Sequence, residues 1–213
     1  MKKETKYALG GFIVGGLVVW SAITSINITS NSEMMNRIGL SASSQKNMMQ
    51  NSNTMDQHFI EQMIPHHEDA ITMAKLAPQK AQHEEIIQLS ENIIDSQSKE
   101  INQMKSWYKS WFGKEVPTNS TVMIQHGMMS DNNSTHMGMM GDEKDMESLS
   151  SSSDFDREFI RQMIPHHQMA VMMANMLKNG TNRPEMRQLA EDIIKAQRTE
   201  IEQMRGWLND WSK

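Results

Sequence analysis

The sequence predicts an all-α protein: a four-helix bundle of two duplicated helical hairpins, preceded by a membrane anchor or signal segment. Three observations lead to this fold class. The stretch Phe59–His67 returns with a single substitution as Phe159–His167. Apolar residues recur at spacings of three and four in each copy, as in amphipathic helices. An apolar run near the N terminus follows several lysines.

The two copies keep a constant offset, because Phe159 matches Phe59 (159 − 59 = 100) and Trp211 matches Trp111 without a gap between them. A repeat of this kind indicates one structural unit that has been duplicated. We therefore divide the chain at the edges of the repeat. The expected order is a signal segment at 1–30, a flexible Met-containing tether at 31–55, a first hairpin at 56–112, a Met/His-rich linker at 113–153 and a second hairpin at 154–213.

The composition excludes several classes of function. A net charge of −5 argues against a general nucleic-acid binder. The absence of cysteine removes disulfides, thiolate zinc sites, iron–sulfur clusters and thiol catalysis. Methionine occurs 23 times, which is unusual for a residue of low average abundance. It either fills cores as a flexible apolar side chain or supplies thioether sulfur, a soft ligand that selects Cu(I).

Residues 1–30 contain lysines followed by an apolar centre from Ala8 to Ile23. This order is typical of an export signal or a signal anchor. No convincing small-x-small cleavage site follows, which favours an uncleaved membrane anchor over a cleaved signal peptide. In both cases the body of the chain is expected to be periplasmic or otherwise extracytoplasmic.

The first predicted helix begins near Thr54 or Asp56 and ends near Leu76, with Pro65 inside it. Pro65 removes one backbone hydrogen bond and should kink the helix just before the paired histidines. Pro165 repeats this arrangement in the second copy. The remaining helices are expected at about 83–111, 154–178 and 183–211. Two helical hairpins of this kind form a four-helix bundle, and the tryptophans near the hairpin ends should close its core.

The linker at 113–153 exceeds an ordinary loop in a compact domain. It contains many methionines and histidines but few other apolar residues, and no helical or strand period organises them. Core filling does not explain such methionines, so metal capture is favoured over random composition. The auxiliary capture residues are Met123, His126, Met128, Met129, His136, Met137, Met139 and Met140.

Each copy of the repeated motif places soft donors on one side of a helix. At about 100° per residue, Met63 and His67 share a face, and His66 and Met73 share the adjoining face. A bundle core is a usual place for a metal site built from facing helices. The candidate ligands are Met63, His66, His67, Met73 and Met104 in the first copy, and Met163, His166, His167, Met173 and Met204 in the second.

Mixed thioether and imidazole donors without thiolate indicate copper, chiefly Cu(I). Glu100 and Glu200 are expected to accept a hydrogen bond from the non-ligating histidine nitrogen, or alternatively to bind the metal themselves. A di-iron site of the ferritin type needs Glu-x-x-His pairs, and neither copy has one. Two alternatives stay open: the histidines are satisfied core residues, and helix methionines such as Met173 and Met176 are core fillers. His58 and His83 are expected at the surface.

The pattern Phe-Ile-x-Gln-Met-Ile-Pro-His-His-x-x-Ala-x-x-Met-Ala, followed by Ile-x-x-x-Gln-x-x-Glu-Ile-x-x-Met-x-x-Trp, resembles a bacterial family of domains of unknown function, number 305. The resemblance covers about 56–112 and 154–211. It implies a ferritin-like helical fold, copper binding and copper tolerance outside the cytoplasm. It places binding on the paired histidines with Met63 and Met104, and on their counterparts Met163 and Met204.

Our leading hypothesis is a non-enzymatic, extracytoplasmic copper-binding protein that sequesters Cu(I) or hands it on. Its partners would be copper ions, a copper transporter or chaperone, and the membrane through the N-terminal segment. A metal-dependent oxidase is one alternative, although no separate acid–base or nucleophile constellation is evident. A helical interaction module with structural histidines is the other.

Overall fold

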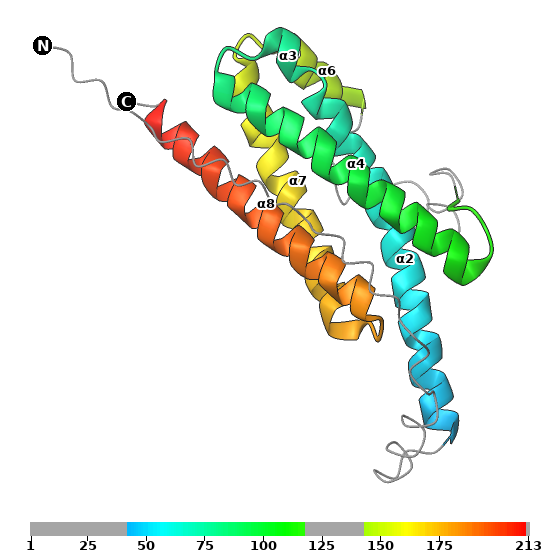
Figure 1. The fold of residues 1–213 in the computed structure, drawn as a ribbon. Coiled ribbons are helices and arrows are strands. Elements are labelled where there is room, and N and C mark those ends of the chain that lie inside the picture. Colours follow the sequence, from blue (N-terminus) through cyan, green and yellow to red (C-terminus); the bar gives the residue numbers. More distant parts are fainter. Residues whose placement is uncertain (1–41, 118–142, 212–213) are drawn as a thin grey trace, which may run out of the picture. The chain divides into compact units, whose positions relative to one another are not determined.

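A computed structural model describes residues 42–117 and 143–211. The chain divides into a unit at Met1–Ala42 and a unit at Ser43–Lys213, and the second holds the helices discussed below. Within the described residues the structure is all-helical (Figure 1). The helices are α2 (Ala42–Ala74), α3 (Ala77–Lys80), α4 (Glu84–Phe112), α6 (Glu143–Ser151), α7 (Phe155–Gly180) and α8 (Pro184–Asp210).

Helices α4, α7 and α8 form where the sequence predicts them. The Asp154 side chain caps α7 by accepting a hydrogen bond from the backbone nitrogen of Arg157, at 3.3 Å. Gly113 ends α4 with φ 68°, the left-handed conformation that glycine adopts readily. Pro65 and Pro165 lie inside α2 and α7. These elements therefore follow from local sequence signals.

Helix α2 begins at Ala42, so the predicted start near Thr54 or Asp56 is wrong. Residues 42–55, which the sequence analysis assigned to a tether, are helical. Extending an existing helix requires no new nucleus, so it costs far less than starting one. Gln, Lys and Met in this stretch are good helix formers even though the stretch has no apolar periodicity.

Helix α6 lies within the linker, which the sequence analysis treated as lacking a helical period. Leu149 of α6 is fully buried, three residues after half-buried Met146. The two apolar residues Met146 and Leu149, three positions apart, are the sequence feature that could have indicated this helix. The capture residues between 123 and 140 and the N-terminal segment at 1–30 lie outside the described residues. No helix in the described part is long and apolar enough to cross a membrane.

The bundle core consists of two clusters that correspond through the repeat. The first joins the stretch of α2 from Phe59 to Ile71 and the C-terminal half of α4 to the C-terminal half of α7 and the N-terminal half of α8. The second joins the opposite halves. Met63 and Met104 thus pack in one cluster with Ala170, while Met163 and Met204 pack in the other with Ala70. Each cluster needs both hairpins.

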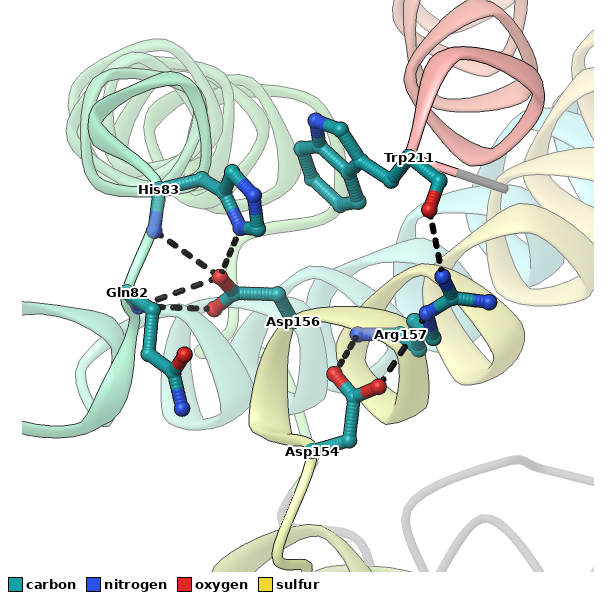
Figure 2. Close-up of polar contacts among 6 residues, drawn as sticks. All are labelled: Gln82, His83, Asp154, Asp156, Arg157 and Trp211. Atoms are coloured by element: carbon teal, nitrogen blue, oxygen red, sulfur yellow. Dashed lines mark hydrogen bonds and ion pairs between the residues drawn. The ribbon is translucent and has the colours of Figure 1, made fainter. Parts of the chain in front are cut away.

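A polar contact fixes the turn before α4 to the start of α7 (Figure 2). Buried Asp156 accepts hydrogen bonds from the backbone nitrogens of Gln82 and His83, at 3.0 and 2.9 Å. His83 Nδ1 also lies 2.6 Å from this carboxylate, and the His83 ring stacks on Trp211 with centroids 3.8 Å apart. His83 is therefore a structural residue and not a simple surface residue.

The other copy repeats this arrangement with an arginine in place of the histidine. Arg183 occupies the place of His83, with its Nε 3.2 Å from an oxygen of buried Asp56. Its guanidinium lies 4.1 Å from the centroid of the Trp111 ring. Trp111 and Trp211 thus lie against the hairpin turns at corresponding positions.

Candidate metal centre

The four motif histidines lie together, and we call them the histidine layer: His66, His67, His166 and His167. All are buried, with at most 5% of each residue exposed. The centroids of the His66 and His166 rings are 3.7 Å apart. The ring centroids of His66 and His67 are 6.4 Å apart, and those of His166 and His167 are 6.2 Å apart. The motifs of the two copies therefore meet where α2 crosses α7, between the core clusters.

One carboxylate anchors each outer ring of the layer. His67 Nε2 lies 2.6 Å from Oε2 of Glu100 on α4. His167 Nε2 lies 2.7 Å from Oε2 of Glu200 on α8. The contact links the two helices of each hairpin and fixes the orientation of the ring. The contact expected between each carboxylate and its histidine is present, and its role toward a metal stays a prediction.

The ring atoms left over from these contacts are unusual for a protein interior. Nδ1 of His67 and Nδ1 of His167 are buried without a hydrogen-bond partner. Nδ1 of His66 and both ring nitrogens of His166 are likewise buried without a hydrogen-bond partner. Buried polar atoms are nearly always paired, so such a group requires an explanation, and a bound ion is one of the standard ones. A neutral imidazole nitrogen without a proton also offers a lone pair to a metal.

The electrostatics keep the inner rings neutral. Burial, and to a lesser extent the neighbouring His67 and His167, lower the pKa of His66 to about 3. Burial also lowers the pKa of His166 well below its usual value, helped by the other three histidines. Metal binding requires neutral imidazole. The layer therefore presents the inner rings in the state that binds metal across the physiological pH range.

The predicted thioether ligands flank the layer. Met63, Met104, Met163 and Met204 are fully buried in the two core clusters. Met63 is one helical turn from His67, and Met163 is one turn from His167. Their burial fits a core-filling role and a ligand role equally. Met73 is also buried, whereas Met173 is half-buried and lies farther along α7.

The histidines and carboxylates do not make a complete site alone. Over residues 42–117 and 143–211, no group of three or more His, Asp or Glu side chains has an arrangement that could hold a metal ion. The site predicted from the sequence adds thioether sulfur from the flanking methionines to these donors. Thioether and imidazole together select Cu(I) over harder ions. The donor chemistry fits the soft metal predicted from the sequence.

Three of the residues discussed above line one surface hollow. Met176 is 62% exposed, so it does not fill the core. Met173 and His58 are half-buried and line a surface hollow together with Met176. No pattern within one helix could have shown this, because the hollow is formed by two distant segments.

The comparison with protein families identifies the fold group. The family described as "Domain of unknown function (DUF305)" matches residues 56–208, which include both hairpins. This chain belongs to that family. The resemblance inferred from the paired-histidine motif is thereby confirmed.

Solved structures of DUF305 relatives share the helical fold. CopM in the Cu(I)-bound form is 47% identical, over 74% of this chain and 98% of that chain, with a TM-score of 0.61. CopM in the Cu(II)-bound form is 51% identical, over 73% and 97%, with a TM-score of 0.62. A DUF305 fragment from Deinococcus radiodurans is 29% identical, over 73% and 96%, with a TM-score of 0.57. The similarity to CopM supports a copper-associated role.

A curated relative is also matched in part. An uncharacterised protein of Acanthamoeba polyphaga mimivirus is 42% identical over 55 residues. The match covers 26% of this chain and 36% of the viral protein. The chain therefore corresponds to about a third of that relative.

Proposed function

We propose that this protein binds copper as Cu(I) in the histidine layer, outside the cytoplasm, and either sequesters the ion or hands it on. The layer would supply imidazole nitrogen, and the flanking methionines would supply thioether sulfur. This function would contribute to copper tolerance. Copper is then a cargo of the protein.

One observation carries the proposal: Glu100 and Glu200 engage the Nε2 atoms of His67 and His167, while the opposite Nδ1 atoms stay buried and unpaired. Metal-ligating histidines almost always donate their other ring N–H to a carboxylate, a carbonyl or water. The arrangement of both copies has this form. A merely structural histidine would be expected to use its second nitrogen as well.

The relatives point in the same direction. Structures of CopM are described as bound to Cu(I), to Cu(II) and to Ag. Ag(I) and Cu(I) are both soft monovalent ions, so thioether and imidazole donors suit both. The identity to CopM extends over most of the part that forms the bundle, which supports carrying copper binding over to this chain.

A storage or delivery role suits the layer better than catalysis. Metal-ion catalysis needs an open coordination position and access for a substrate. The histidines of the layer are at most 5% exposed, so a substrate larger than the ion has no direct access. The N-terminal segment would place the protein at the outer face of the membrane, where a copper transporter or chaperone is the natural partner.

The test is a Cu(I) competition titration of the purified chain and of the double variant His67→Ala, His167→Ala. We expect tight binding in the parent protein and its loss in the variant, with helical content checked by circular dichroism. Cu(I) should also raise the melting temperature of the parent only, because a ligand that binds the folded state stabilises it. Unchanged affinity in the variant would reject the layer as the binding site. A melting temperature insensitive to copper would favour an interaction module.

A further inference from the structure

A surface hollow between α2 and α7 collects soft donor atoms outside the histidine layer. It has a volume of about 540 Å³ and is lined by Met55, His58, Met173 and Met176, with buried Phe59 and Leu177 beneath them. Met55 and His58 are three residues apart on α2, and Met173 and Met176 are three residues apart on α7. Each pair therefore lies on one side of its helix. We call this place the thioether hollow.

The exposure of Met55 and Met176 argues against a packing role for these two side chains, whereas half-buried Met173 packs against the first core cluster. Met176 is 62% exposed and Met55 is 37% exposed, so both sulfur-containing side chains are open to solvent. An exposed apolar side chain gains little from the hydrophobic effect. The described residues that line the hollow include no carboxylate. Three thioethers and one imidazole make a donor set that favours a soft monovalent cation.

Gly180 allows Met55 to reach the end of α7. A Cβ atom at Gly180 would lie 2.2 Å from the sulfur of Met55, closer than two such atoms can approach. The absence of a side chain at this position thus leaves room for the thioether. Lys80 occupies the matching position of the first copy.

The repeat supplies an internal comparison for the hollow. At the matching positions of the other half, Phe155 and Glu158 replace Met55 and His58, and Met73 and Leu76 replace Met173 and Met176. Of the four thioether and imidazole donors, only one has a counterpart of the same kind in the other half, namely Met73. The fold is the same in both halves, so bundle geometry alone does not require methionine and histidine at these positions.

The matching place in the other half is also covered. Leu149 of α6 is fully buried there, in the cluster that holds Phe155 and Ala77. Ser148 of α6 donates a hydrogen bond to Glu158 at 3.0 Å, and Lys80 donates one to the carbonyl oxygen of Ser150 at 2.8 Å. Over residues 42–117 and 143–211, one half therefore fills this place with a helix, and the other leaves it open with soft donors around it.

We propose that the thioether hollow is a second binding site for a soft monovalent cation, Cu(I) or Ag(I), separate from the histidine layer. On α7, Met173 and Met176 follow His166 by seven and ten residues, about 10 and 15 Å at the helical rise per residue. The two sites are thus too far apart to share one ion. The proposal does not depend on metal binding in the histidine layer.

The test counts Ag(I) ions on the full chain by native mass spectrometry and measures their affinity by titration. The triple variant Met55→Leu, Met173→Leu, Met176→Leu removes the sulfurs and conserves apolar volume, so the fold should persist. We expect it to hold one Ag(I) ion fewer than the parent. Met172→Leu is the matched control, because Met172 is 51% exposed on α7 but does not line the hollow.

Two further variants separate this site from the layer. His67→Ala with His167→Ala should keep the ion that the triple variant loses. His58→Gln should weaken binding at the hollow by about tenfold or more, since removing even a residue that only supports a ligand costs about 10–100-fold in affinity. An equal ion count in the parent and the triple variant would overturn the proposal, as would an equal loss in Met172→Leu. A histidine variant that loses no ion would refute the layer and leave the hollow standing.

Discussion

The imidazole rings of His66 and His166 lie in contact at the crossing of α2 and α7, with centroids 3.7 Å apart. The two residues hold the same position in the two copies of the repeat. The centre of the bundle is therefore formed by both hairpins, and one hairpin can supply only half of it. The predictions below follow from this shared layer and from the contacts around it.

The stability of the metal-free protein should fall in mild acid because of His66. Its folded-state pKa is lowered to about 3, whereas an unfolded histidine keeps a pKa near 6.5. Well above pH 6.5, His66 is unprotonated in both the folded and the unfolded state, so it does not make the stability depend on pH. As the pH falls below 6.5, only the unfolded state is protonated, and folding is weakened. Between pH 7 and pH 5 the loss should be about 2 kcal/mol.

Urea unfolding of the parent and of His66→Leu at both pH values checks this effect. Between pH 7 and pH 5 the unfolding free energy of the parent should fall by about 2 kcal/mol more than that of the variant. The lowered pKa of His166 acts in the same direction in both proteins, so the comparison isolates His66. Parallel pH profiles would show that the ring is protonated in the folded state.

The carboxylates beside the layer should tune metal affinity. In the double variant Glu100→Gln, Glu200→Gln, each amide can still contact its histidine, but it no longer stabilises the ring N–H with a full charge. We expect Cu(I) affinity to fall about 10–100-fold, as for other partners of metal-ligating histidines. Competition titration measures the change. Glu202→Gln is the control, because Glu202 is exposed and lies two residues from Glu200; an equal loss in that variant would point to net charge as the cause.

The thioethers beside the layer can be separated from core packing. Met63→Leu with Met163→Leu keeps apolar volume and should cost less than about 1.5 kcal/mol per site in stability. Cu(I) affinity should nevertheless fall, because the sulfur is lost. Met186→Leu, at a fully buried position occupied by Ile86 in the other copy, should leave affinity unchanged. If the double variant binds Cu(I) as tightly as the parent, these methionines only fill the core.

Asp156 should matter for stability and not for metal binding. Asp156→Asn leaves donors of Gln82 and His83 without their charged acceptor in a buried site, so we expect a loss of about 1–3 kcal/mol. Asp154→Asn is the control two residues away, because asparagine caps a helix as well as aspartate does. Thermal and urea unfolding measure both effects. Equal stability of the two variants would mean that the contact in Figure 2 contributes little.

Much of the fold could be predicted because its signals are local. Helices α4, α7 and α8 carry apolar residues at spacings of three and four, and Asp154 and Gly113 mark helix ends. The start of α2 could not be placed, since residues 42–55 have helix propensity without apolar periodicity. Helix α6 could not be predicted, because the core position of its buried residue Leu149 becomes evident only once α6 packs against α7.

The candidate site was predictable in its parts and not in its assembly. Helical spacing put Met63 and His67 on one face and Glu100 near them, because these relations hold within one hairpin. The contact of His66 with His166 depends on how the hairpins cross, and no periodicity encodes a crossing. The thioether hollow likewise joins Met55 of α2 to Met176 of α7, two helices that are far apart in the sequence.

A pair of identical hairpins would be bound by symmetry to show the same surface on both sides of its centre. Here the two hairpins belong to one chain, so mutation can change one side alone. His58 faces the open hollow, whereas its counterpart Glu158 is tied to α6 by Ser148. Within the described residues, the duplication thus gives a nearly symmetric bundle a polarity, with a hollow on one side and a covering helix on the other.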